Sequence, residues 1–120
     1  MTIVVDITVP SNVDFRREFA VVDDDGLSRA DLYLSRLFFH ARTTYDAPLI
    51  SLQASTDPRI GGLQILAPIG AGRFVMFFPA AALKRAGAGA FVHDLIEVTP
   101  LLIRRRLWRG TFTIEQGVTR

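Results

Sequence analysis

The sequence predicts an all-β protein, an Ig-like or jelly-roll-type β-sandwich with one short helix. Short apolar and aromatic runs alternate with polar residues, which is the period of half-buried strands. Turn-forming residues separate these runs at short intervals, and one segment has a helical pattern instead. A chain of 120 residues, 49% of them hydrophobic, can bury one core, so residues 1–120 are expected to form a single domain.

The strands are expected from the alternation of their side chains. Ile3, Val5 and Ile7 share one face of the first strand, and the second strand, 13–22, keeps the same alternation. Residues 32–42 are aromatic and lie between turns, which favours a strand, although a helix is compatible with this segment. The expected strands are 2–9, 13–22, 32–42, 49–52, 63–67, 73–78, 91–99, 103–108 and 111–115.

Turn and helix signals complete the expected order of elements. The run Asp-Asp-Asp-Gly at 23–26 predicts a hairpin turn, because Asp and Gly tolerate positive φ. Residues 79–86 predict the helix, since Pro suits a first helical turn and Lys84 and Arg85 suit the last one. Arg109-Gly110 predicts a two-residue turn between the last two strands.

The composition limits the classes of partner and chemistry. Fourteen basic residues nearly balance twelve acidic ones, so we expect no specific nucleic-acid partner and no membrane partner. The absence of cysteine excludes disulfides, thiolate metal sites and cysteine nucleophiles. Every basic residue except Lys84 is an arginine, whose planar fork suits protein interfaces, although genome base composition gives the same bias.

The candidate subunit interface is a face formed by Arg104, Arg106, Trp108 and Glu115. The first three residues alternate along one expected strand, and a turn at 109–110 brings Glu115 opposite Arg104. Glu97 is expected on the other side of Arg104, which completes a cross-strand charge ladder. Basic residues beside an aromatic ring are also typical of nucleic-acid binding, which is the alternative for this small patch.

Arg105 does not fit this arrangement easily. Its side chain would face the core between Ile96 and Ile114. A charged side chain is costly to bury without a partner. This predicts either a contact with a partner subunit or a β-bulge that changes the register.

Residues with catalytic or metal-binding chemistry are few. His93 and Asp94 are neighbours, but adjacent residues of a strand point to opposite faces, so a structural role is expected. The acidic run 23–25 with Asp31 lacks the spacing of an EF-hand, and a plain turn is favoured over a calcium site. We therefore predict no catalytic residue, no cofactor-binding residue, no cofactor and no metal ligand.

A series of motifs follows in order along nearly the whole chain. They are Asp14-Phe15 with Phe19, Asp23-Asp24-Asp25-Gly26, Ala30-Asp31-Leu32, Pro48-Leu49-Ile50-Ser51-Leu52, Gly72-Arg73-Phe74, Phe78-Pro79, Gly89-Ala90-Phe91-Val92-His93-Asp94-Leu95, Arg106-Leu107-Trp108-Arg109-Gly110 and Gly117-Val118-Thr119-Arg120. This order resembles small bacteriophage tail or baseplate structural proteins, and is similar to the N-terminal module of baseplate upper proteins. The chain departs from that pattern at Phe91 and His93, and at Pro100-Leu101, which replaces the usual Asp-Gly hairpin.

The resemblance implies a non-enzymatic virion protein of the tail, baseplate or tail adaptor. Such a protein works by multivalent assembly with copies of itself and other virion proteins, and is located in the virion after assembly in the host cytoplasm. The N-terminal strand, 2–9, is a candidate for exchange between subunits. The alternative is a carbohydrate- or other ligand-binding sandwich at the host-facing end of a tail, with Trp108 and Tyr33 or Tyr45 as its aromatic platform. No small-molecule substrate is expected.

Overall fold

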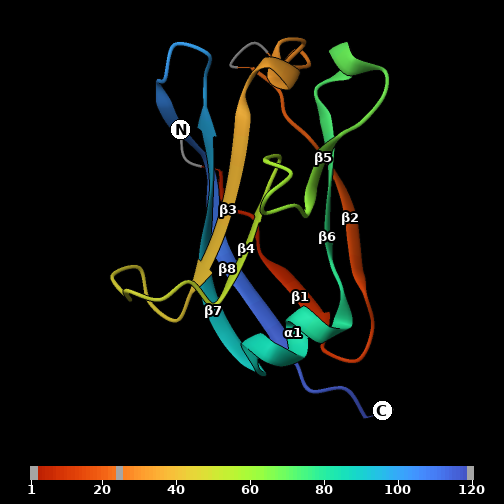
Figure 1. Cartoon of the computed structure of the whole chain (residues 1–120), viewed down its shortest axis with the longest axis vertical. Helices are drawn as coiled ribbons and strands as arrows, with labels where there is room; N and C mark the ends of the chain where they lie inside the picture. Colours follow the sequence, from red (N-terminus) through yellow and green to blue (C-terminus); the bar gives the residue numbers. More distant parts are fainter. Residues whose placement is uncertain (1–2, 24–25, 119–120) are drawn as a thin grey trace.

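The computed structural model of the chain describes residues 3–23 and 26–118, and most of its regular structure is β-strand. Two sheets face each other, and the larger one is curled into a half-barrel (Figure 1). Their strand orders are β1-β8-β7-β3-β4 and β2-β6-β5. The strands are β1 (Ile7–Pro10), β2 (Phe15–Ala20), β3 (Arg36–Arg42), β4 (Leu52–Ser55), β5 (Leu63–Ile65), β6 (Arg73–Phe78), β7 (Gly89–Val98) and β8 (Arg104–Glu115). The described residues also form the helix α1 (Ala80–Ala86) and the 3₁₀ turns η1 (Leu32–Leu34) and η2 (Ile69–Ala71).

An aromatic cluster between the two sheets forms the core. Phe112 of β8 is fully buried at its centre. Its ring centroid lies 5.9 Å from Phe15 of β2, 5.8 Å from Phe39 of β3 and 5.9 Å from Phe78 of β6. These rings meet edge to face, which is a favoured geometry for aromatic pairs. The alternating pattern in the sequence therefore places these aromatic residues on the inner faces, and the prediction of a mostly β fold with one short helix is confirmed.

Strand β8 runs without a break through Arg109 and Gly110, so the predicted turn at these residues is wrong. It pairs with β7 in antiparallel register, and Gly110 lies opposite His93. A Cβ atom at Gly110 would overlap the carbonyl group of Val5, which crosses this point of the strand. Gly110 therefore allows the backbone of Val5 to approach β8 closely. Such a close approach is a common reason for glycine inside a strand.

The N-terminal strand β1 lies parallel to β8 at one edge of the larger sheet. Ile7 and Val9 point into the core and are buried. The carboxylate of Asp6 accepts hydrogen bonds from the backbone N–H (2.9 Å) and the hydroxyl (3.0 Å) of Thr111, and these bonds lower its pKa. The strand thus belongs to the sheet of its own chain, and its exchange between subunits stays a prediction.

Several predicted strands begin later than expected: the strand predicted at 2–9 begins at Ile7, and the strand predicted at 13–22 begins at Phe15. The segment 32–34 forms η1 instead of extended chain, because Leu32 is buried while Tyr33 and Leu34 are both exposed and break the alternation. Residues 49–51 are irregular, and β4 starts at Leu52. The predicted helix is confirmed as α1, which begins one residue later than expected.

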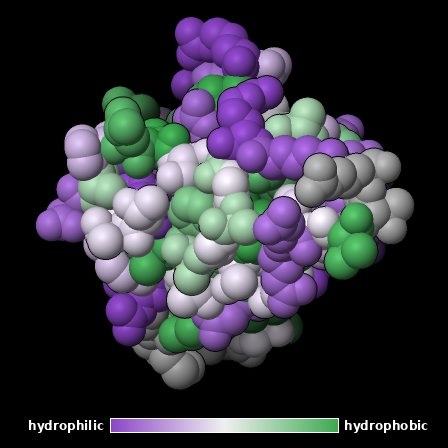
Figure 2. All heavy atoms as spheres, turned by 90° about the horizontal axis from the view of Figure 1, so that it is seen from below, coloured by the Kyte–Doolittle hydropathy of each residue, from purple (hydrophilic) through white to green (hydrophobic). Residues whose placement is uncertain are grey.

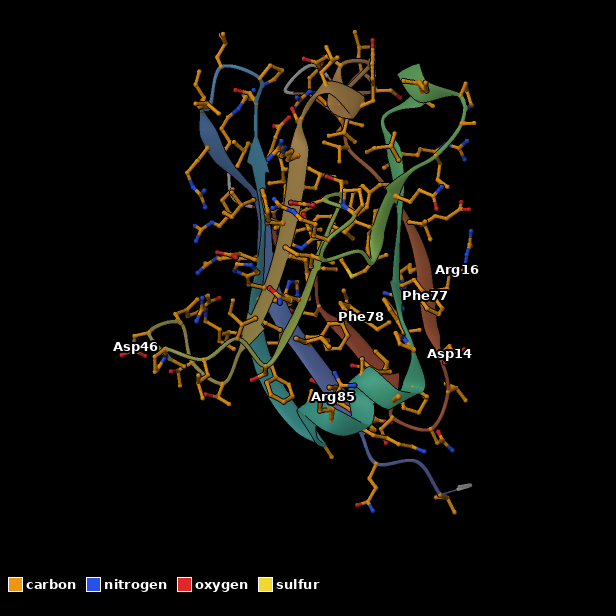
Figure 3. The ribbon with its side chains drawn as sticks, in the orientation of Figure 1. Asp14, Arg16, Asp46, Phe77, Phe78 and Arg85 are labelled. Carbon is orange, nitrogen blue, oxygen red and sulfur yellow. The ribbon has the colours of Figure 1, made fainter. Side chains whose placement is uncertain are left out.

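The start of α1 is held by Asp14, the residue that directly precedes β2. The carboxylate of Asp14, just before β2, accepts a hydrogen bond of 2.8 Å from the backbone N–H of Ala80. Figure 3 shows Asp14 at the foot of β2, on the same side of the molecule as the start of the helix. The helix ends at Gly87, whose φ of 89° is accessible to glycine at little cost. An N–H group at a helix start needs such an acceptor, which Asp14 supplies from a distant part of the sequence.

A buried ion pair lies near the end of the molecule opposite α1. Glu97 of β7 is fully buried, and Arg29 binds its carboxylate with both terminal nitrogens, at 3.2 Å and 2.7 Å. The hydroxyl of Ser35 donates a third hydrogen bond of 2.6 Å. This bidentate contact attaches the long connection between β2 and β3 to the centre of the larger sheet.

The ion pair sets the charge state of Glu97. Burial by itself raises the pKa of this carboxyl, but the hydrogen bonds from Arg29 and Ser35 and the positive charges of Arg29 and Arg105 outweigh it. The pKa of Glu97 is therefore below its ordinary value, and the pKa of Arg29 is raised. Glu97 pairs with Arg105 in the strand register, so the predicted position of Glu97 opposite Arg104 is wrong.

Candidate functional site

The predicted interface residues do not all lie on one face. Arg104, Arg106 and Glu115 are exposed, whereas Trp108 is only 5% exposed. The cause is a β-bulge: Leu95 pairs with Trp108 and the next residue of β7, Ile96, pairs with Arg106, so Leu107 has no partner. One extra residue reverses the alternation of the strand. The expectation that Trp108 shares a face with Arg104 and Arg106 is therefore wrong, while a bulged register near Arg105 was one of the stated alternatives.

Trp108 is a core residue. Its ring centroid lies 4.9 Å from that of Phe19 and 5.8 Å from that of Phe74, both on the smaller sheet. A carbohydrate platform needs an aromatic face that is open to solvent. The alternative function that used Trp108 as this platform consequently loses the ring on which it depended. Tyr33 and Tyr45 remain exposed, at 48% and 57%.

The predicted charge ladder is absent from the described part of the chain. Arg104 pairs across the sheet with Val98, and Arg106 pairs with Ile96. Glu115 lies at the far end of β8, beside Pro10 of β1. Within the described residues, neither Arg104 nor Arg106 has a carboxylate within 4.0 Å. These two guanidinium groups are therefore available to an acidic partner.

Further arginines lie on the same outer face of the larger sheet. Successive residues of a strand point to alternate faces of the sheet. The register therefore places Arg36, Val98 and Arg104 in one row across the sheet, with Val98 in the middle. It places Arg42 and Arg109 on the same face. Asp94 is a carboxylate among them, in the row between His40 and Arg109. The small net charge of the chain thus conceals a concentration of positive charge on one face, which a count over the whole sequence does not detect.

The hairpin between β7 and β8 carries an exposed apolar tip. Leu101 and Leu102 are each 81% exposed, and Ile103 is 53% exposed. Leu34 of η1 lies beside them and is 55% exposed. Figure 1 shows this hairpin and η1 at the end of the molecule opposite α1. Adjacent apolar side chains in water mark an interaction site more often than isolated ones do.

The tip is held in a strained conformation. The N–H of Leu102 donates to the carbonyl of Thr99 (2.8 Å), and the N–H of Thr99 donates to the carbonyl of Ile103 (2.9 Å). Leu102 has a φ of 64°, a left-handed conformation that favours glycine. A leucine in this conformation costs about 1–2 kcal/mol.

Replacing Leu102 with glycine is expected to stabilise the isolated protein by about 0.5–1 kcal/mol. The variant relieves the left-handed strain, and part of that gain is offset because glycine has more freedom in the unfolded chain. Urea unfolding of Leu102→Gly beside Leu102→Ala measures the difference, since alanine keeps the strain but loses the side chain. A glycine variant less stable than the alanine variant contradicts this account.

A surface hollow lies beside the tip, and we call it the tip hollow. It has a volume of about 440 Å³. Its lining residues come from η1, β3, the hairpin and the adjoining ends of β7 and β8, and are Leu34, Arg36, Phe38, Val98, Thr99, Pro100, Leu102 and Arg104. The sequence pattern indicates Arg104 but not the other residues that line the tip hollow. The apolar run after Pro100 was the available signal, because a turn normally carries polar residues.

His93 and Asp94 have the separate structural roles that the alternation predicts. His93 points into the core, 1% exposed, with its Nε2 atom 2.8 Å from the carbonyl oxygen of Val5. Asp94 pairs with His40 on the outer face. The imidazole and the carboxylate therefore do not meet, and His93 instead helps to hold the segment that leads into β1.

Stability is expected to fall as the pH drops below about 6.5, the ordinary pKa of histidine, because burial lowers the pKa of His93. The hydrogen bond to the carbonyl of Val5 opposes this shift without reversing it. Below the ordinary pKa the unfolded chain binds the proton more strongly than the folded chain does. Protonation therefore lowers the free energy of unfolding. Urea midpoints at about pH 7.5 and about pH 5.5 measure the effect. His93→Gln should show a smaller difference between them, and an equal difference in both proteins would rule His93 out as its source.

Metal ligands do not gather in the described residues. No group of three or more His, Asp or Glu side chains there is placed to hold an ion. In the acidic turn, the N–H of Leu27 donates to the Asp23 carboxylate (2.9 Å), and Asp31 pairs with Arg29 (3.0 Å). Asp24 and Asp25, which the calcium alternative also used, lie outside the described residues.

A second hollow of about 410 Å³ lies along the edge strand β4, between the sheets and α1. Phe77, Phe78 and Leu52 line it, and Arg85 of α1 is its one charged lining residue. In Figure 3, Phe78 points between the sheets, and Arg85 lies on the helix below it. Seen from the α1 end, polar and apolar residues are interspersed (Figure 2). This hollow lacks an acid–base pair, which most catalytic sites need.

Comparison with known proteins adds no relative to this description. No protein-family model matches the chain, and no curated protein matches it either. Among the described residues, no helix has the length and apolar character required to cross a bilayer. The positions of the arginines and of the apolar tip therefore provide the structural observations for a functional proposal.

Proposed function

We propose that the protein is a non-enzymatic structural subunit of a bacteriophage tail, baseplate or tail adaptor. It acts by multivalent assembly with copies of itself and with other virion proteins, and it is located in the virion after assembly in the host cytoplasm. The bacteriophage assignment rests on the order of motifs along the chain. The finer fold assignment, an Ig-like or jelly-roll-type sandwich, is also a proposal, which the two facing sheets support.

One observation carries the assembly role. Arg104 and Arg106 are exposed without a carboxylate partner in the described residues, and they directly follow the exposed residues Leu101 and Leu102. Arginine and apolar side chains are typical of the centres of protein interfaces. Many copies on a symmetric ring multiply weak individual contacts into a stable assembly. The surface therefore supports binding to proteins better than it supports chemistry on a small substrate.

Mass spectrometry of purified phage particles tests the proposal. The producing phage is grown, and intact particles and isolated tails are analysed separately for peptides of this chain. We expect the chain in both samples, at several copies per particle. A chain that is present in the lysate but absent from washed particles would contradict the virion role.

A variant series then tests the surface. The double variant Arg104→Glu/Arg106→Glu is expected to reduce incorporation into particles, while Arg16→Glu, an exposed arginine of the smaller sheet, serves as the control. Figure 3 shows Arg16 on the outer side of that sheet, away from β8. Equal incorporation of both variants would exclude the arginine-bearing face as the contact.

A further inference from the structure

We infer that the tip hollow binds a short acidic and apolar segment of a neighbouring virion subunit. The inference rests on the proposed function and adds the chemistry of the partner. The segment is expected to insert one apolar side chain into the hollow and to place carboxylates on Arg36 and Arg104. The apolar insertion and the carboxylate contacts each follow from a separate feature of the hollow.

Apolar side chains form part of the wall of the hollow, beside the polar groups of Arg36, Thr99 and Arg104. Leu34, Phe38, Val98 and Leu102 line it, and its volume of about 440 Å³ lies in the range of sites that enclose a side chain or small ligand. Leu34 and Leu102 form its exposed apolar walls. Covering these side chains removes apolar surface from water, which favours binding of an apolar group.

The conformation of Leu102 points to an external contact. Glycine would form the same left-handed turn without strain. The chain instead places an 81% exposed leucine there, in contact with the hollow. Because most of this side chain lies in water, packing against the described residues does little to offset the strain, and a contact with another molecule accounts for it.

Two arginines flank the apolar walls. Arg36 of β3 and Arg104 of β8 lie on opposite sides of Val98 in one row of the sheet, which separates their backbones by two strand spacings, about 10 Å. An extended peptide advances about 3.3 Å per residue, so carboxylates three positions apart match this distance. Neither arginine has a carboxylate within 4.0 Å among the described residues. The guanidinium fork binds a carboxylate with two hydrogen bonds.

The shape favours a peptide over an anionic bilayer. A bilayer surface accommodates a protruding apolar tip, but it does not require a concave hollow with a cation on each side. Here the walls come from separate elements, η1, β3, β7 and the hairpin, which together surround one surface hollow. A defined side chain with carboxylates at fixed spacing uses all of these features.

Selection from a displayed library of random 12-residue peptides tests the inference. Selection on the wild-type protein is run beside selection on the double variant Leu102→Asp/Arg104→Glu. Leu49→Asp/Arg85→Glu is the matched control, because it makes the same chemical changes at an exposed leucine and an exposed arginine elsewhere. We expect enriched peptides with an apolar residue between two acidic residues that are three positions apart.

Binding of the enriched peptide is then measured by fluorescence anisotropy. Leu102→Asp/Arg104→Glu should weaken it by about tenfold or more, whereas the matched control should leave it unchanged. The affinity should also fall as salt is added. Absence of enrichment, a consensus without acidic residues, or equal binding by both double variants would overturn the inference.

A vesicle assay separates the lipid outcome. Binding to phosphatidylglycerol vesicles that Leu102→Asp/Arg104→Glu abolishes, together with a failed peptide selection, would replace the peptide with an anionic bilayer. The outcome for the proposed function is independent. If the chain is found in particles but enriches no peptide, the virion role stands and this inference is rejected. If the chain enriches the expected peptides but is absent from particles, the peptide-binding hollow stands and the virion role is rejected.

Discussion

Replacing Glu97 with alanine is expected to lower the free energy of unfolding by about 3–5 kcal/mol. The substitution removes the carboxylate that both terminal nitrogens of Arg29 bind, and leaves that largely buried guanidinium with the exposed Asp31, on its Nε atom, as its remaining acidic partner within the described residues. It also deprives the Ser35 hydroxyl of its acceptor. Urea unfolding followed by circular dichroism measures the change. A loss below about 1 kcal/mol would show that the pair contributes little.

Two further variants separate the ion pair from packing. Glu97→Gln keeps the shape and should still cost stability, because a neutral amide cannot compensate the charge of Arg29. Arg29→Met/Glu97→Leu removes both charges, and is expected to be more stable than either single substitution, since paired buried charges can be replaced by apolar groups at little cost. A double variant as unstable as the sum of its parts would contradict this explanation.

The contribution of Glu97 depends on pH in a defined direction. Its pKa is lower in the folded chain than the ordinary 4.5, so the unfolded chain binds the proton more strongly. The stabilisation is complete above about pH 4.5 and is lost as the pH falls further through the folded-state pKa. This window lies below that of His93, so acid unfolding of Glu97→Gln beside His93→Gln measures the contribution of each residue, while His40 and the carboxyls of Asp6, Asp31 and Asp57, whose pKa values are also lowered, account for the remainder.

Replacing Trp108 with alanine is expected to cost about 3–5 kcal/mol of stability. The indole packs against the stacked rings of Phe19 and Phe74 and is 5% exposed, so its removal leaves a cavity. Urea unfolding measures the loss. Trp108→Phe should cost less and stay measurable if the alanine variant fails to fold.

The control for Trp108 is a neighbour on the same strand. Arg106→Ala is expected to change stability by no more than about 0.5 kcal/mol, because Arg106 is exposed and makes no ion pair within the described residues. The original sequence pattern placed both residues on one exposed face, and it therefore predicts small effects for both. Similar small losses would support that pattern and contradict the bulged register.

The mostly β fold could be predicted because its signals are local. Side-chain alternation along β7, and the proline-to-glycine pattern around α1, depend on residues close together in the sequence. The bulge beside Leu107 could not be predicted, because one unpaired residue reverses a face without leaving a distinct pattern. The placement of Trp108 failed for that reason alone.

The candidate site was predictable in part. Arg104 and Arg106 were identified from their alternation, and both are exposed. Arg36 and Leu34, which come from another part of the chain, could not be assigned to the same surface before the order of the strands was known. Gly110 was misinterpreted because a glycine that admits a crossing backbone and a glycine that forms a turn look alike in a sequence.

The parallel pairing of β1 with β8 has a consequence for the order of folding. Ile7 lies beside Phe112, so the first strand finds its place only after almost the whole chain has left the ribosome. Contacts between residues so distant in sequence form late, since the cost of closing the long loop comes before any gain. Until then the edge of β8 that pairs with β1 has no neighbouring strand of its own chain. Under the proposed assembly role, the subunit would therefore complete its larger sheet only at the end of its synthesis.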